Sequence, residues 1–70
     1  MLRKPVSSSN LRSVGYDEQN ATLEIEFNSS GIYQYFHVPF QAYAALISAP
    51  SHGRYFAAHI KHSYPYRRIA

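Results

Sequence analysis

The stretch from Gly31 to Pro39 constrains the fold of this chain more than any other. It reads Gly-Ile-Tyr-Gln-Tyr-Phe-His-Val-Pro. Large and polar side chains alternate around Tyr33 and Tyr35, and alternation at period two predicts a strand over 32–38. Pro39 ends the strand because proline has no backbone donor. The stretch therefore indicates a sheet with aromatic side chains that are able to bind a partner.

Two more strands are expected before this one. The first covers 11–17. The clearest covers 22–27, where three apolar side chains alternate with two glutamates. Turn-forming residues separate the strands by only a few positions, so neighbouring strands should be antiparallel.

Two helices are expected after the strands. Pro39 suits the first position of a helix over 39–49, and Pro50 ends that helix. A second helix over 51–62 begins with Ser51 as its N-cap, because the hydroxyl can accept a hydrogen bond from a free amide. The apolar arc expected to face the sheet from the first helix consists of Phe40, Tyr43, Ala44, Leu46 and Ile47.

These elements predict the fold class α+β. The sheet is a three-stranded antiparallel β-meander, and the two α-helices that follow pack on one face of it. The expected divisions of the chain are a flexible leader over 1–8, one folded domain over 9–66 and a C-terminal tail over 67–70.

The composition excludes several classes of protein. Seventy residues make one small domain, and the absence of cysteine excludes disulfides and thiolate metal sites. No apolar run approaches the roughly 18 residues of a membrane span. We therefore expect a cytoplasmic monomer that uses its eleven Tyr and Phe side chains to build a core.

The charges are divided unevenly along the chain. All four acidic residues lie within the first 26 positions, whereas the rest of the chain holds Arg54, Lys61, Arg67 and Arg68 with all four histidines. A segment with one sign of charge favours a polyanionic partner, provided that its cations share one surface. The alternative is a basic face that is simply solvated.

The facing of the tyrosines depends on the strand register. If Phe27 pairs with Ile32, Tyr33 and Tyr35 face solvent and can stack on unpaired bases. If Phe27 pairs with Tyr33, both tyrosines face inward. The inward arrangement is favoured, because a core this small needs the rings and Gln34 is better placed outside.

Two basic segments are candidates for phosphate contact. The second helix begins with His52, Gly53 and Arg54, whose free amides and charges suit an anion, although simple capping by Ser51 is also consistent. The tail mixes tyrosines with arginines, a composition that suits nucleic acid. It equally suits a strap in which Tyr64 and Ile69 dock on the sheet edge; docking is favoured for Tyr64, with the arginines in solvent. The residues predicted to bind nucleic acid are Tyr33, Tyr35, His52, Gly53, Arg54, Lys61, Tyr66, Arg67 and Arg68.

Catalysis and metal binding have little support. No carboxylate follows position 26 to orient a histidine as a base or as a metal ligand. His59 should pack against the sheet. Glu24 and Glu26 are interpreted as the solvent side of their strand, or as partners for Arg12. We expect no enzyme activity, no cofactor and no metal.

A set of short motifs, taken in order, resembles the KTSC domain family. The motifs are Val14-Gly15-Tyr16-Asp17, Leu23-Glu24-Ile25-Glu26-Phe27, Tyr33-Gln34-Tyr35, Val38-Pro39, Tyr43, Ser51-x-Gly53-x-Tyr55-Phe56 and Ile60-Lys61. The family resembled occurs at the C-terminus of some lysyl-tRNA synthetases and as small bacterial and phage proteins. This context implies an RNA partner. Where many members have an asparagine after the Tyr-Phe pair, this chain has Ala57-Ala58.

The function predicted from the sequence is non-enzymatic binding of RNA or tRNA. Four phosphate contacts predict a salt slope of about −3 for a single strand. The alternative is a protein–protein interaction module, in which the exposed edge of the third strand accepts a partner.

Overall fold

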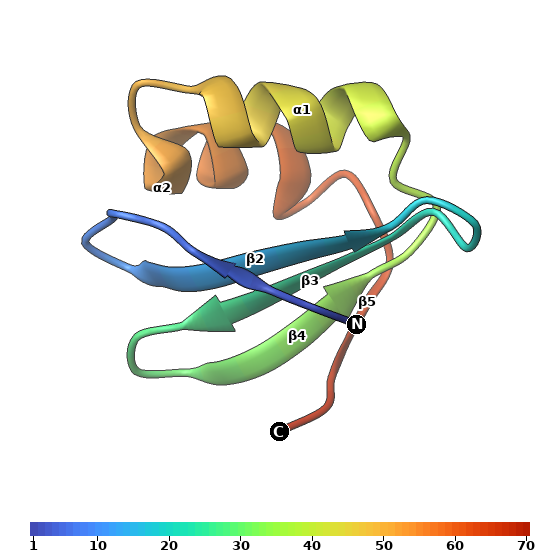
Figure 1. Cartoon of the computed structure of the whole chain (residues 1–70), viewed down its shortest axis with the longest axis horizontal. Coiled ribbons are helices and arrows are strands. Elements are labelled where there is room, and N and C mark those ends of the chain that lie inside the picture. Colours follow the sequence, from blue (N-terminus) through green and yellow to red (C-terminus); the bar gives the residue numbers. More distant parts are fainter.

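A computed structural model describes all of residues 1–70. The molecule has two layers, with helices covering one face of a five-stranded antiparallel sheet whose strand order follows the sequence (Figure 1). The elements are β1 (Lys4–Pro5), β2 (Leu11–Asp17), β3 (Thr22–Phe27), β4 (Gly31–Tyr35), α1 (Phe40–Ser48), α2 (His52–Tyr55), the single-turn π-helix η1 (Phe56–Ile60) and β5 (Tyr66–Arg68).

The predicted meander forms the centre of this sheet. The bounds of β2 and β3 are confirmed, and β4 begins at Gly31 and ends earlier than expected, at Tyr35. The early end has a local cause, because His37 adopts a left-handed conformation with φ of 62° and turns the chain out of the sheet. The edge strands β1 and β5 come from the segments expected to be a leader and a tail.

Because β5 pairs with β4, the third strand of the meander has no free edge. Backbone bonds between Ile32 and the last two residues extend this cover, with Ile69 N donating to Ile32 O over 2.8 Å. The expectation that the third strand has an exposed edge is therefore wrong, and a partner strand has no free edge to pair with there. The actual edges of the sheet have two and three residues, and such short edges discourage pairing with another chain.

The pairing of β4 with β3 determines that Tyr33 and Tyr35 point toward the helices. Phe27 pairs with Gly31, so neither of the two pairings considered from the sequence occurs. The tyrosines nevertheless face inward, as the favoured alternative predicts, because Tyr33 lies opposite Ile25 on the face that the helices cover. A turn of three residues joins the strands, and Gly31 closes it with φ of 94°, a conformation that glycine adopts without strain.

Helix α1 covers the sheet with a narrower stripe than the sequence pattern predicts. Leu46 is fully buried, but Phe40 and Ile47 are 49% and 37% exposed. A helix touches a sheet along one line, so residues at the margins of a wide apolar arc remain at the surface. Phe40 instead packs beside the stacked rings of Tyr16 and Tyr43.

The second predicted helix is divided. Ser51 caps it as expected, because its hydroxyl accepts a hydrogen bond from Arg54 N over 3.3 Å. The regular part ends at Tyr55, and η1 continues it as one π-turn in which Lys61 N donates to Phe56 O over 2.9 Å. The chain is thus one residue longer over this turn than a regular α-helix would be.

The core lies between the helices and the sheet. Its buried members are Leu11, Val14, Leu23, Ile25, Tyr35, Val38, Leu46, Phe56 and Ile60. None of the helices has the length and hydropathy needed to cross a membrane.

Candidate functional site

A pocket of about 420 Å³ opens between the β4–β5 side of the sheet and η1. We call it the tyrosine pocket. Its lining residues are Asn10, Phe27, Ser29, Ser30, Tyr33, Tyr35, Phe56, Ala57, Lys61, His62 and Tyr66. No carboxylate is among them, so the pocket is suited to an anionic ligand.

Aromatic rings form its walls. Tyr33 and Tyr66 come from neighbouring strands, and their ring centroids are 5.9 Å apart. Tyr35 lies beside Tyr66 at 5.5 Å and meets Phe56 edge to face at 5.4 Å. Tyr66 is 59% exposed, whereas Tyr35 is only 4% exposed. The ring face available for stacking is therefore offered by Tyr33 and Tyr66, and Tyr35 supports them from below.

The surroundings of Tyr35 affect the ionisation of its hydroxyl. Burial, followed by the neighbouring phenols of Tyr66 and Tyr33, raises the pKa of Tyr35 to about 12. The Tyr35 hydroxyl is therefore neutral at physiological pH. Neutral phenols can both donate and accept hydrogen bonds, so these groups do not determine which polar edge of a ligand is preferred.

The π-turn brings Lys61 to the pocket. In a regular α-helix, five steps of about 100° would place Lys61 about 140° around the helix from Phe56. In η1 the hydrogen bond between these two residues sets Lys61 one full turn beyond Phe56, on the same side. Both side chains consequently line the pocket, and Ile60 remains buried beneath.

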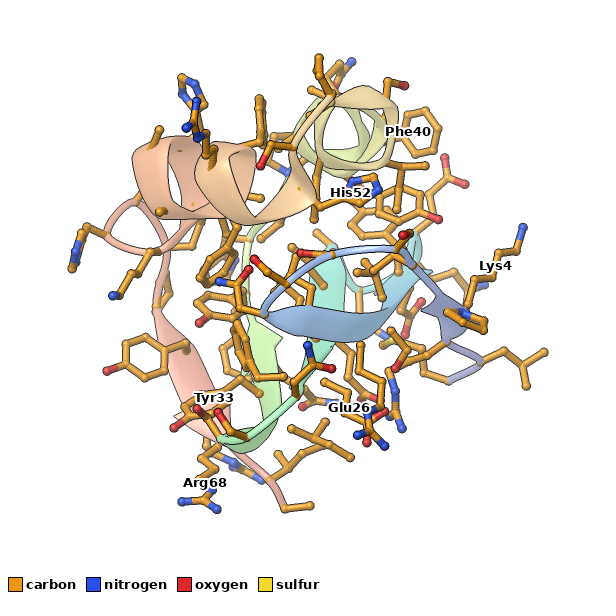
Figure 2. The ribbon with its side chains drawn as sticks, turned by 90° about the vertical axis from the view of Figure 1, so that its left-hand side faces the viewer. Lys4, Glu26, Tyr33, Phe40, His52 and Arg68 are labelled. Carbon is orange, nitrogen blue, oxygen red and sulfur yellow. The ribbon has the colours of Figure 1, made fainter.

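The neighbouring arginines of β5 lie on opposite faces of the sheet. Arg68 is opposite Tyr33 and shares the face of the tyrosine pocket, and Figure 2 shows it next to Tyr33. Its Nε lies 3.0 Å from where a Cβ on Gly31 would be. Arg67 is opposite Gln34, on the face that the helices leave open. The predicted cations therefore do not form one surface.

The predicted phosphate site at the start of the second helix is separate from the pocket. His52 Nδ1 is hydrogen-bonded to Leu46 O over 2.8 Å, so this ring joins α2 to α1. Gly53 packs closely against Asn10, and Arg54 is exposed. None of these three helix residues lines the tyrosine pocket. The structure gives His52 and Gly53 packing roles.

Two loops that sequence reasoning did not connect close one end of the pocket. Asn10 belongs to the β1–β2 loop, and Ser29 and Ser30 belong to the β3–β4 loop. Asn28 N donates to Asn10 O over 2.9 Å, which joins the two loops. No local pattern signals this contact, because the partners are 18 positions apart and carry ordinary turn residues.

The carboxylates of β3 lie on the opposite face of the sheet. Glu24 is 5% exposed and forms an ion pair with Arg3, not with Arg12 as proposed from the sequence. Gln34 Nε2 also donates to Glu24 over 2.9 Å. Burial alone would raise the pKa of Glu24, but the hydrogen bonds from Gln34 and Arg3 outweigh burial and lower this pKa below its usual value.

One histidine prediction also changes. His59 is exposed and packs on Tyr55, with ring centroids 4.5 Å apart, and does not face the sheet. The extra residue of η1 accounts for the change, since Ile60 takes the inward position.

The fold and the pocket define a small α+β domain with an aromatic pocket that has no acidic side chain in its lining. The model of the KTSC domain family matches residues 7–64. This chain belongs to the KTSC domain family.

Its relatives include both separate proteins and parts of larger ones. A protein of Stutzerimonas stutzeri (strain A1501) is 44% identical over 99% of both chains. The lysine–tRNA ligase of Nostoc sp. (strain PCC 7120) is 38% identical over 99% of this chain, which spans only 12% of the ligase. The crystal structure of a KTSC domain protein from Yersinia pestis matches with a TM-score of 0.97, 46% identity and coverage of 99% and 97% of the two chains.

Proposed function

We propose that this domain binds single-stranded RNA by holding one unpaired nucleotide in the tyrosine pocket. The observation that carries the proposal is a pocket lined by tyrosine rings and Lys61 with no acidic side chain, with Arg68 on the same face of the sheet. Arg68 Nε donates to Ala70 O over 2.8 Å, and the rest of its guanidinium can contact a phosphate. In this proposal the base stacks against Tyr33 and Tyr66. The flanking phosphates contact Lys61 and Arg68.

The magnitudes fit weak binding of a single strand. One base stacked on an aromatic side chain contributes roughly 1–3 kcal/mol, and the size of the pocket lies within the usual range for small ligands. Tyrosine rings accept any base by stacking, so this part of the site provides affinity with little sequence preference. Two cations add a modest contribution that salt will screen.

The relatives support RNA as the polyanion. A segment similar to this chain recurs within lysine–tRNA ligases of Nostoc and Trichormus strains, and the name of these enzymes includes tRNA. For this chain, RNA binding is the proposal. The ligase activity of these relatives is not assigned to it.

The test is fluorescence anisotropy of a labelled uridine decamer titrated with the full chain between about 50 and 200 mM salt. Two phosphate contacts predict a slope of log K against log salt of about −1.4, whereas four contacts predict about −2.8. Lys61→Gln and Arg68→Gln should each weaken binding at least threefold.

Arg67→Gln is the matched control. It removes the same charge from the adjacent position of β5, but on the opposite face of the sheet. Binding by this variant should equal that of the unchanged domain. Equal losses in Arg67→Gln and Arg68→Gln would overturn the assignment to the pocket, and the absence of any salt-dependent binding would overturn RNA binding itself.

A further inference from the structure

We infer that the tyrosine pocket selects uracil and guanine, which carry a carbonyl at pyrimidine C4 or purine C6, over cytosine and adenine, which carry an amino group there, and that Asn10 is the selecting residue. The inference rests on the proposed RNA binding and adds a base preference to it. It follows from the kind of hydrogen-bonding groups that the pocket presents and from the contacts that Asn10 makes.

Asn10 is an exposed loop residue that contacts three other parts of the chain. Its backbone carbonyl accepts a hydrogen bond from Asn28 N over 2.9 Å. Its Oδ1 accepts from the Ser8 hydroxyl over 3.3 Å and lies against Gly53, where a Cβ would overlap it. Only glycine leaves room for the carboxamide at this point of α2, so the loop and the helix together set its position.

The other end of the carboxamide is free. Asn10 Nδ2 has no hydrogen-bond partner in the structure, although the residue lines the pocket. Lys61 adds an ammonium group, which can only donate. The remaining polar groups are hydroxyls and a histidine ring, which can donate or accept. The pocket therefore holds groups that must donate and no carboxylate that must accept.

This pattern distinguishes bases by one substituent. Uracil presents O4 as an acceptor where cytosine presents an amino donor, and guanine presents O6 where adenine presents an amino donor. A carbonyl can accept from Asn10 Nδ2 or from Lys61. An amino group at the same position cannot accept from either of these donors and can pair only with the hydroxyls or the histidine ring, which we expect to weaken binding about tenfold.

The experiment compares ligands that differ at this substituent. Uridine and cytidine decamers are titrated by anisotropy, and uridine and cytidine monophosphates by ¹⁵N shifts of the pocket residues. A deoxyuridine decamer shows whether the ribose hydroxyl also contributes. The monophosphates show whether a free nucleotide is bound as well as a strand. The expected result is uridine binding about tenfold tighter than cytidine in both forms.

Asn10→Asp replaces the amino group with an oxygen and tests the residue directly. The ratio of uridine to cytidine affinity should fall to about one or reverse. Gln19→Glu makes the same change of charge at the exposed β2–β3 turn, so it controls for the added negative charge. This control should keep the ratio while weakening both ligands only slightly. Asn10→Ala should also reduce the ratio, mainly by weakening uridine.

The outcomes separate the two proposals. Tight, salt-dependent binding with equal affinity for uridine and cytidine would overturn the base preference and leave RNA binding intact. A preference that survives in Asn10→Asp would assign the selection to another residue and overturn the role of Asn10. If no oligonucleotide binds, both the proposed function and the base preference fail.

Discussion

Replacement of Arg3 by alanine should lower the free energy of unfolding by about 2 kcal/mol at pH 7. Arg3 forms an ion pair with Glu24, and its Nε donates to the Ser13 hydroxyl over 2.9 Å. Without Arg3, the buried carboxylate of Glu24 keeps only its hydrogen bond from Gln34. The short strand β1 also loses its side-chain connection to the sheet.

The magnitude follows from the burial of the two partners. Hydrogen bonds to charged groups contribute roughly 1.5–3 kcal/mol. The Glu24 side chain is 7% exposed, but that of Arg3 is 25% exposed, so solvent screens part of the attraction and the lower half of this range applies. For a domain of this size, a loss of about 2 kcal/mol lowers Tm by about 10 °C.

The contribution of Glu24 to the free energy of unfolding changes with pH in one direction. The pKa of Glu24 in the folded state lies below its usual value of 4.5, so the unfolded state binds the proton more readily. The ionised carboxylate therefore stabilises the fold above about pH 4.5, and this contribution is lost as the pH falls through the folded pKa. The effect of Arg3→Ala should shrink accordingly at acidic pH.

The assay is urea denaturation followed by circular dichroism at pH 7 and at about pH 3. Arg12→Ala is the matched control, because Arg12 is exposed and forms no ion pair. The control should change the unfolding free energy by less than about 0.5 kcal/mol. A loss for Arg3→Ala as small as that, or an equal loss at both pH values, would refute the reasoning.

Two further predictions test the helix packing and the pocket. Leu46→Ala should cost about 3 kcal/mol of unfolding free energy and Ile47→Ala less than about 1, since Leu46 is fully buried and Ile47 is 37% exposed; equal losses in urea denaturation would mean that α1 faces the sheet differently. Phenolate absorbance should show a tyrosine titrating near pH 12 that Tyr35→Phe removes. Because its folded pKa exceeds the unfolded value near 10, Tyr35 stabilises the fold below pH 10 and loses this effect as the pH rises through 12. Simultaneous ionisation of all seven tyrosines would contradict this assignment.

The strand β3 was predictable because apolar and charged side chains alternate along its sequence. Every second side chain of β3 is apolar and faces the helices, and the two glutamates face away, so a local pattern determines both its type and its bounds. The edge strands have only two and three residues, which is too short for a period to be recognised. Their pairing depends on backbone bonds to strands formed elsewhere in the chain.

The sequence indicated which residue types would gather and less about their positions. Four of the residues predicted to bind nucleic acid, Tyr33, Tyr35, Tyr66 and Lys61, line one pocket, and their role in binding stays a prediction. The facing of Arg67 and Arg68 depends on how β5 pairs with β4, which no local pattern reveals. The contribution of Asn10 depends on contacts between loops that only the folded chain brings together.

The π-turn makes the number of residues between Phe56 and Lys61 more important than their identity. A relative with the same number of residues but a regular α-helix would carry its lysine about 140° around the helix from the phenylalanine. A relative with one residue fewer would place its lysine about 40° from the phenylalanine, and would keep the cation on the pocket side without a π-turn. The length of this short interval therefore has to be considered together with the type of helix when members of the family are compared.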